Sequence, residues 1–399
     1  MTATEQASVV EQSLARVGAI ELDVERLDLS IESDLALQDQ VRLEGAAGEG
    51  APTLRQQGNV LVVHQRGSHR LADGTPVVLR VPAERCPPIR GELQHGRLSV
   101  KNVFVGVDVK SGTGVLRVEG GTGPATLTSG SGRVSTHDRE GAITLISGTG
   151  GVEASRINGR LNLNNGTGPT QISHCIGPIH ANQGVGDFLL TDWMGEIRLN
   201  IGTGAATFKR CDVVRASLNS GSGAVRFEKG VLGGLNLVAG SGAVISTALL
   251  AQVPNGASPK DEQTYQVEAG SGNVSFALPK DIPARVEVVV KEGEVESEVP
   301  LVNVGRPGPR SAARRYVGVS NTAIGRGEAP KVNLRIRSEK GDVELRLDGK
   351  VRTRSGRGSG AAEEQRAIDR DDEIRAILDA LERKEISVDD AEALLDAIT

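Results

Sequence analysis

The sequence predicts an all-β protein: a single-stranded β-solenoid, or β-helix, of coils of about 18 residues, with a small C-terminal α-helical hairpin. Three observations predict it. Gly-x-Gly tripeptides recur at a fixed spacing, apolar residues recur at the same spacing, and the final segment changes to a helical period. Aromatic residues make up only 2% of the 399 residues, which suits a core of stacked Val, Ile and Leu.

The repeat is marked by the first glycine of each Gly-x-Gly tripeptide. Successive tripeptides begin at a constant step in the first part of the series and at a slightly longer step later, with an insertion before the last. We interpret these glycines as structural turns, because a sharp turn needs a positive φ and stacked corners leave little room for a Cβ. They are Gly112, Gly130, Gly148, Gly166, Gly184, Gly202, Gly221, Gly240 and Gly270.

Apolar residues follow the tripeptides in register. The second residue after each tripeptide is mostly apolar, as in Leu116, Val134 and Val152, and a second column contains Ile143 and Leu161. Spacing of two within a segment is the alternation of a β-strand, and equal spacing between segments stacks like residues in successive coils. A Gly-rich antiparallel sandwich is the alternative, although it does not require a constant period.

The repeat also divides the chain into parts. We expect Gly341–Leu345 to form the last coil and Lys350–Gly360 to be flexible. The predicted parts are an N-terminal segment (1–16), a cap with irregular first coils (17–105), the solenoid (106–347) with loops near 250–264 and 305–329, a linker (348–365) and a two-helix module (366–399).

Two amphipathic helices are predicted after the linker. Ile374, Ile377, Leu378 and Leu381 follow the i, i+3, i+4, i+7 rule, and a second helix presents Leu394 and its neighbours. Helices this short bury little surface alone, so we expect the hairpin to dock on the solenoid, on another copy or on a partner.

Both regions resemble known families. The tripeptide segments GSGRV, GTGGV, GSGAV and GSGNV resemble the bacterial "putative adhesin" family of Gly-rich β-strand repeat proteins, over residues 17–347. The segment EIRAILDALERKEISVDDAEALLDAI resembles the SHOCT-like two-helix module of LiaX- and YvlB-type proteins, which join such a module to the same kind of repeat. The module here is C-terminal instead of N-terminal, and Lys384 stands where its turn commonly has Gly. The resemblance implies a bacterial protein of envelope stress or the cell surface, without catalytic activity.

Motifs for catalysis and for cofactors are not evident. Carboxylates and histidines on the coils are interpreted as scattered surface or turn residues: Asp138, Glu140, Asp187, Asp192, His137, His174 and His180. The Gly-x-Gly runs lack the Asp of calcium-binding repeats and the pattern of phosphate loops. Cys86, Cys175 and Cys211 form no CxxC, which suits a reducing compartment. We therefore predict no enzyme, no cofactor, no metal and no small-molecule substrate.

Charge is distributed unevenly toward the C-terminus. Residues 306–357 contain 14 Lys/Arg against 5 Asp/Glu, whereas 363–399 contain 13 Asp/Glu against 5 Lys/Arg. Either both are solvated surfaces, or the acidic hairpin docks on the basic segment, or the basic segment contacts anionic lipid. Nucleic acid is disfavoured, because Tyr316 is the only aromatic there. The predicted interaction residues are Arg306, Arg310, Arg314, Arg315, Ile374, Leu378, Leu381, Leu394 and Leu395.

Three functions remain open from the sequence. The first is a non-enzymatic scaffold that binds a protein partner or itself, with the hairpin as a regulatory or oligomerisation module. The second is a polymerising cytoskeletal scaffold similar to bactofilins, and the third is a carbohydrate-active β-helix enzyme. Neither a signal peptide nor an apolar membrane span is evident, so we expect a cytoplasmic protein that can associate with a membrane surface.

Overall fold

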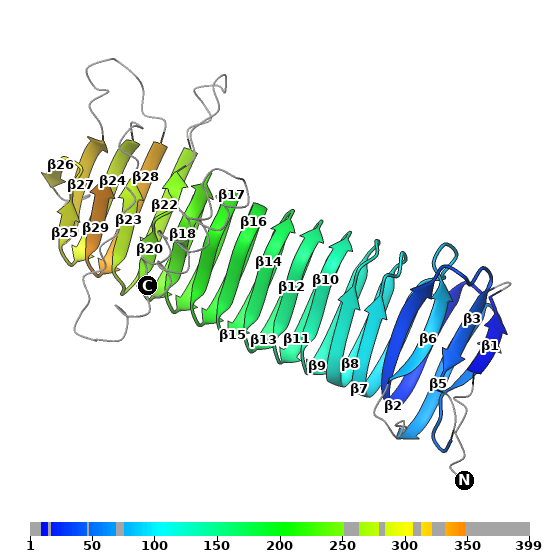
Figure 1. Cartoon of the computed structure of the whole chain (residues 1–399). Coiled ribbons are helices and arrows are strands. Elements are labelled where there is room, and N and C mark those ends of the chain that lie inside the picture. The colour runs from blue at the N-terminus through cyan, green and yellow to red at the C-terminus, as the bar shows by residue number, and fades with distance from the viewer. Residues whose placement is uncertain are drawn as a thin grey trace, which may run out of the picture. The chain divides into compact units, whose positions relative to one another are not determined.

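Parallel strands stacked at the sequence repeat make up most of the structure. The computed structural model describes residues 9–14, 17–45, 48–68, 76–250, 263–278, 284–305, 313–320 and 332–347. These residues form 29 strands in one hydrogen-bonded sheet and no helix, which confirms the all-β prediction (Figure 1). The chain divides into two units, Met1–Val351 and Arg352–Thr399. The predicted linker and two-helix module lie outside the described residues.

Each regular coil contains two short strands, and each strand pairs with its equivalent one coil later. Strand β10 (Val134–Glu140) pairs in parallel with β12 (Val152–Asn158), and β11 (Ile143–Thr149) pairs with β13 (Leu161–Thr167). The partners are one sequence repeat apart, as in Val134↔Val152. The strands therefore form two rows: the first row contains β10 and β12, and the second row contains β11 and β13.

The remaining central strands continue these rows, and three long strands, β8, β16 and β17, pass through both. The remaining central strands are β8 (Val107–Glu119), β9 (Ala125–Ser131), β14 (Thr170–Ile176), β15 (Ile179–Val185), β16 (Phe188–Thr203), β17 (Ala206–Ser222), β18 (Val225–Leu232), β19 (Leu235–Ser241), β20 (Val244–Ser246) and β21 (Leu249–Leu250). The longer step of the later repeats has a local cause. Gly195 pairs with Val213 but Glu196 pairs with Arg215, so Val214 is an extra, 62% exposed residue in a bulge.

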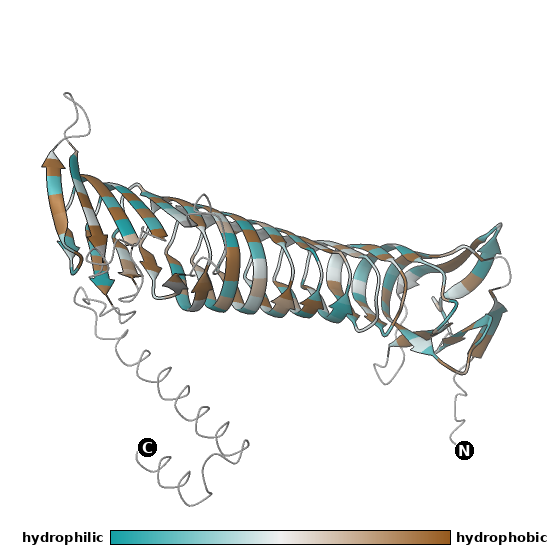
Figure 2. Cartoon of the chain, turned by 90° about the horizontal axis from the view of Figure 1, so that it is seen from above, coloured by the Kyte–Doolittle hydropathy of each residue, from teal (hydrophilic) through white to brown (hydrophobic). Residues whose placement is uncertain are grey.

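The core lies between the two rows and is one continuous apolar cluster. Buried strand residues alternate with more exposed ones, as in β15, and hydropathy alternates along the strands (Figure 2). Most buried residues are Val, Ile, Leu and Ala, as the stacked columns predict. Most of the few aromatics lie on the inside, although Phe104 is 52% exposed, and Phe208 stacks on Phe227 with a centroid distance of 4.7 Å.

The N-terminal coils are stacked out of sequence order. Strand β2 (Ala19–Asp34) lies between the coil of β5 (Val60–Ser68) and β6 (Val77–Pro82) and the strand β7 (Ile89–Lys101). Outside them the pairing turns antiparallel: β3 (Gln40–Glu44) and β1 (Val9–Ser13) extend the first row, and β4 (Thr53–Gln57) extends the second. Parallel stacking therefore ends at an antiparallel edge.

The C-terminal coils show the same exchange of order. The coil of β28 (Val332–Lys340) and β29 (Val343–Leu347) lies between the coil of β22 (Gln263–Ala269) and β23 (Val274–Leu278) and that of β24 (Ala284–Glu292) and β25 (Val295–Ser297). Gly341–Leu345 belongs to the last coil in the sequence, but the coil of β24 and β25 lies beyond it in the stack. The prediction that Gly341–Leu345 forms the last coil is therefore wrong.

Part of the predicted loop at 305–329 is also a strand. Antiparallel β27 (Arg314–Ser320) pairs with β24 and with β26 (Leu301–Gly305). The glycines and arginines of this segment suggested a loop, but Tyr316, Val317 and Val319 supply the strand residues.

The glycines mark the corners, but for a reason that differs within each tripeptide. In most of the tripeptides the second glycine has the positive φ, +146° at Gly150 and +122° at Gly168. The first glycine lies at the end of a strand without a positive φ, and a Cβ on Gly166 would lie 2.4 Å from the carbonyl oxygen of Gly148. The nine predicted turn glycines are thus sites of close backbone approach, and the turn itself belongs to the second glycine.

A buried polar residue before many of the tripeptides completes the corner. The hydroxyl of Ser147 donates to the carbonyl of Gly132, 3.2 Å away, and that of Ser129 donates to Gly114 at 3.3 Å. In a later coil the Gln183 amide donates to Gly168 at 2.6 Å. These bonds tie the buried side chain of one coil to a glycine carbonyl at the corner of the preceding coil.

Close approach, more than backbone conformation, should govern the cost of replacing these glycines. We expect Gly166→Ala to lower the free energy of unfolding by roughly 2–4 kcal/mol, because its Cβ overlaps a backbone oxygen that cannot move alone. Gly58→Ala is the control: φ is +62° and nothing lies within 4 Å, so about 1 kcal/mol is expected. Chemical denaturation measures both, and equal losses would contradict this interpretation.

Candidate functional site

The predicted interaction residues fall into two groups. Arg306 and Arg310, together with Ile374, Leu378, Leu381, Leu394 and Leu395, lie outside the described residues. Arg314 and Arg315 begin strand β27 and were expected on a loop. The Arg314 guanidinium donates to the carbonyl of Gly293, and Arg315 Nε lies 2.8 Å from Glu287 Oε1. Both arginines therefore have partners within the solenoid.

Other cations of the basic segment are paired as well. Arg335 Nε lies 3.7 Å from Glu287 Oε2, and Lys340 Nζ lies 3.5 Å from Glu292 Oε2. Arg346 binds Glu344, and this hydrogen bond raises the pKa of the Arg346 guanidinium. The acidic partners mostly precede the segment in sequence, so the coil exchange at this end brings them beside it. Most cations of its described part therefore have partners within the solenoid.

A ladder of charged residues lines one corner of the first row. These residues have φ between 51° and 56°, in the left-handed region that disfavours side chains. They recur at the coil spacing, so the interpretation of Asp138, His174 and Asp192 as scattered is wrong: steps of whole coils stack them on one corner. The ladder consists of Asn102, Asp138, Arg156, His174, Asp192, Arg210 and Lys229.

The ladder residues bind one another. Arg156 Nη2 lies 2.6 Å from Asp138 Oδ2, and this contact holds the pKa of the Asp138 carboxyl below its usual value. Arg210 Nε lies 2.7 Å from Asp192 Oδ1, and His174 Nε2 lies 3.4 Å from Asp192 Oδ2. Each carboxylate is thus held by a cation of a neighbouring coil. Such an arrangement favours ionised, hydrogen-bonded carboxylates and not a proton-exchanging pair.

Arg139 is a buried cation that the sequence analysis did not single out. It is 2% exposed, and its guanidinium donates to the carbonyls of Val103, Val105, Gly120, Thr122 and Gly123 at 2.8–3.2 Å. Burial lowers its pKa to about 10, so it remains protonated at neutral pH. Its inward column later holds Ile157 and Cys175, and this exception to an apolar column was the available signal.

The other conspicuous side chains have structural surroundings. Cys86, Cys175 and Cys211 are buried and free, and burial raises the pKa of all three thiols, to about 12 for Cys86 and Cys211. Asp187 Oδ1 accepts the backbone N–H of Ala205 at 2.9 Å. Thiols of this kind pack as apolar groups and do not act as nucleophiles near neutral pH.

The outward face of the second row differs from the first. Seven successive second-row strand segments carry Thr, Ser, Asn, Ile and Val outward, and Arg198 is their only Lys, Arg, Asp or Glu. We name this surface the uncharged face. Its segments are 125–131, 143–149, 161–167, 179–185, 197–203, 216–222 and 235–241.

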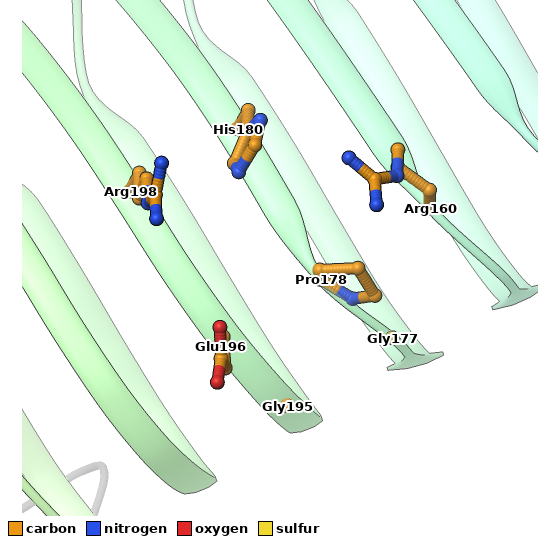
Figure 3. Close-up of a pocket in the computed structure, with 7 residues that line it drawn as sticks. All are labelled: Arg160, Gly177, Pro178, His180, Gly195, Glu196 and Arg198. Carbon is orange, nitrogen blue, oxygen red and sulfur yellow. The ribbon is translucent and has the colours of Figure 1, made fainter.

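An open depression of about 470 Å³ lies along one edge of the uncharged face. Figure 3 shows Arg160, His180 and Arg198 on successive coils, with Pro178 and Glu196 beside them. Its wall combines guanidinium donors with one carboxylate acceptor. Among the described residues no group of three or more His, Cys, Asp or Glu residues could hold a metal ion.

Comparisons with known proteins do not identify a family. No family model matches the chain, and no curated protein matches it. One solved structure, described as a "putative cell adhesion protein" from Clostridium sporogenes, has a TM-score of 0.18 and 8% sequence identity. That match covers 86% of this chain and 100% of the other. A score this low carries no argument about fold or function.

Removing the buried guanidinium should cost stability. We expect Arg139→Met to lower the free energy of unfolding by about 3 kcal/mol or more, because five backbone carbonyls lose a buried donor. Arg139→Lys keeps the charge but reaches fewer carbonyls, so it should fall between Arg139→Met and wild type. Arg156→Met removes an exposed arginine and should change stability little. Similar losses for Arg139→Met and Arg156→Met in denaturant titrations would overturn this role.

Proposed function

We propose that this protein is a non-enzymatic scaffold whose solenoid presents two different long surfaces to binding partners. One observation carries the proposal: carboxylates of the first row are engaged by cations of neighbouring coils, as in Asp138 with Arg156 and Asp192 with Arg210. Acid–base catalysis needs a carboxyl group with a proton to exchange in a site that excludes water. A ladder of exposed ion pairs instead gives a rigid, patterned surface.

The finer parts of the proposal come from the sequence resemblance. The protein is bacterial, acts in envelope stress or surface-associated regulation, and lies in the cytoplasm or at the membrane periphery. The hairpin at 366–399 is its regulatory or oligomerisation module, and a protein or a second copy is the partner, with an anionic membrane surface as a further one. Among the described residues there is no candidate for a membrane-spanning helix.

A bactofilin-like polymer is the competing function. End-to-end stacking of solenoids needs a parallel edge at both ends of the rod. Here the N-terminal edges are antiparallel β1 and β4, and one C-terminal edge is antiparallel β26. These edge strands do not follow the parallel pairing at the coil repeat, so a second solenoid cannot extend the stack through them. Discrete particles are therefore favoured over filaments.

Electron microscopy of the full chain and of a variant lacking residues 363–399 tests the scaffold function. We expect discrete particles from both chains. The truncated chain should bind anionic vesicles more strongly, because the acidic hairpin no longer competes with the vesicle for the cations of residues 306–357. Hydrogen exchange in 313–320 and 332–347 should also rise on truncation.

Three outcomes would count against the proposal. Filaments of the full chain would favour the polymer, and unchanged vesicle binding and exchange would reject the regulatory hairpin. Turnover of a bacterial glycan that Asp187→Asn abolishes would show an enzyme. Asp187 also accepts a hydrogen bond from the backbone N–H of Ala205. The Asp187→Asn variant must therefore be shown to have the unfolding temperature of the wild type before its activity is compared.

A further inference from the structure

We propose that the uncharged face binds a neutral polysaccharide, with the depression between Arg160 and Arg198 as its firmest contact. The inference deepens the proposed interaction function and rests on it. It starts from a contrast between two faces of the same coils.

The coil itself does not require an uncharged surface. First-row strands of the same coils carry Lys209, Arg210 and Asp212 in β17 and Arg226 and Glu228 in β18. Charged residues also return on the second row beyond the uncharged face. They include Asp108 and Lys110 in β8 before it and Glu268, Arg335 and Arg337 in β22 and β28 after it. Exposed surfaces of soluble proteins usually mix both signs of charge. The absence of charge is therefore a property of this surface and not of the fold.

Side chains of the uncharged face are also held in place. Asn219 Nδ2 donates to Asn200 Oδ1 at 2.9 Å, and Asn200 Nδ2 donates to Asn182 Oδ1 at 2.9 Å. Stacked Thr149 and Thr167 are β-branched and stiff at χ1. Ordering these side chains is already complete before a ligand arrives, which lowers the entropic cost of binding.

The hydrogen-bonding groups fit hydroxyls best. In its hydrogen bonds to Asn182 and Asn219, the Asn200 side chain uses one N–H and one lone pair. One N–H and one lone pair of Asn200 therefore remain for a ligand. Threonine and serine hydroxyls likewise both donate and accept. An anionic polymer would need an excess of donors, and a cationic one an excess of acceptors. A polymer of sugar hydroxyls matches side chains such as Asn, Ser and Thr, each of which can both donate and accept.

The shape of the face indicates an extended ligand. With about 4.8 Å between strands and about 3.3 Å per residue, seven strands of seven residues span roughly 30 Å by 20 Å. Small molecules bind in enclosed clefts, whereas the depression here is open. Within the depression the Arg160 and Arg198 guanidinium groups can donate and the Glu196 carboxylate can accept, so hydroxyls of one sugar unit can be held more firmly there.

The test uses the full-length protein and co-sedimentation with insoluble cellulose, chitin and starch granules. We expect at least one neutral polysaccharide to bind, with little change at high salt, because no ion pair contributes. Long chains should bind more tightly than short oligosaccharides, since many weak hydrogen-bonding sites act together.

Matched lysine substitutions then place the ligand. Asn200→Lys puts a charge in the middle of the uncharged face, and we expect about tenfold weaker binding, close to 1.4 kcal/mol. Gln171→Lys makes the same charge change at an exposed first-row position and should bind as wild type does. Both side chains are exposed, and the two hydrogen bonds that Asn200→Lys removes lie at the surface, so the unfolding temperature should change little in either variant.

Each alternative outcome overturns the inference in its own way. No binding to any neutral polysaccharide, or equal loss in both variants, rejects it while the scaffold function stands. Salt-sensitive binding to alginate instead would show an acidic polymer held by Arg160 and Arg198. A dimer in light scattering that Asn200→Lys abolishes, without glycan binding, would assign the face to a second copy. Turnover of a bound glycan would reject the non-enzymatic function and leave the binding surface.

Discussion

The structure depends on one contact that recurs in the regular coils: backbone against backbone at the glycine corner. Parallel pairing at the spacing of the repeat places the carbonyl of Gly148 where a Cβ of Gly166 would stand. Only a residue without a side chain permits the two rows to remain hydrogen-bonded through the corner. The core columns, the charged ladder and the uncharged face all follow, because a constant corner keeps every residue above its equivalent.

Much of this architecture could be predicted because the repeat can be read directly from the spacing of glycines and apolar residues in the sequence. The period, the alternation of the strands and the apolar columns all require only that position 152 resemble position 134. The same reasoning failed at the ends. Strand β2 pairs with β7, and β22 pairs with β28, across other strands that lie between them in the sequence, so no repeat reports either neighbour. Strand β27 was missed because its partners are antiparallel and lie outside the repeat.

Functional residues were harder to predict than the fold, for a different reason. Asp138 and Asp192 are three repeats apart, and their place on one corner appears only when the chain is aligned by coil. Arg139 likewise stands out from the buried Ile157 and Cys175 of its column only after the same alignment by coil. The uncharged face is a property of seven separate segments, and each of them by itself looks like an ordinary Thr- and Asn-rich strand. Its meaning lies in what those segments share once they are stacked.

The exchanged coil order at the two ends has a consequence for how the chain is made. At the N-terminus, one edge of β2 stays unpaired until β7, its parallel neighbour from later in the sequence, has been synthesised. The opposite end has the same delay, because β24 remains separated from β22 until β28 inserts between them. Closing these long loops costs more entropy than adding the next sequential coil. The middle coils are thus expected to form first during translation, and the two insertions complete the rod afterwards.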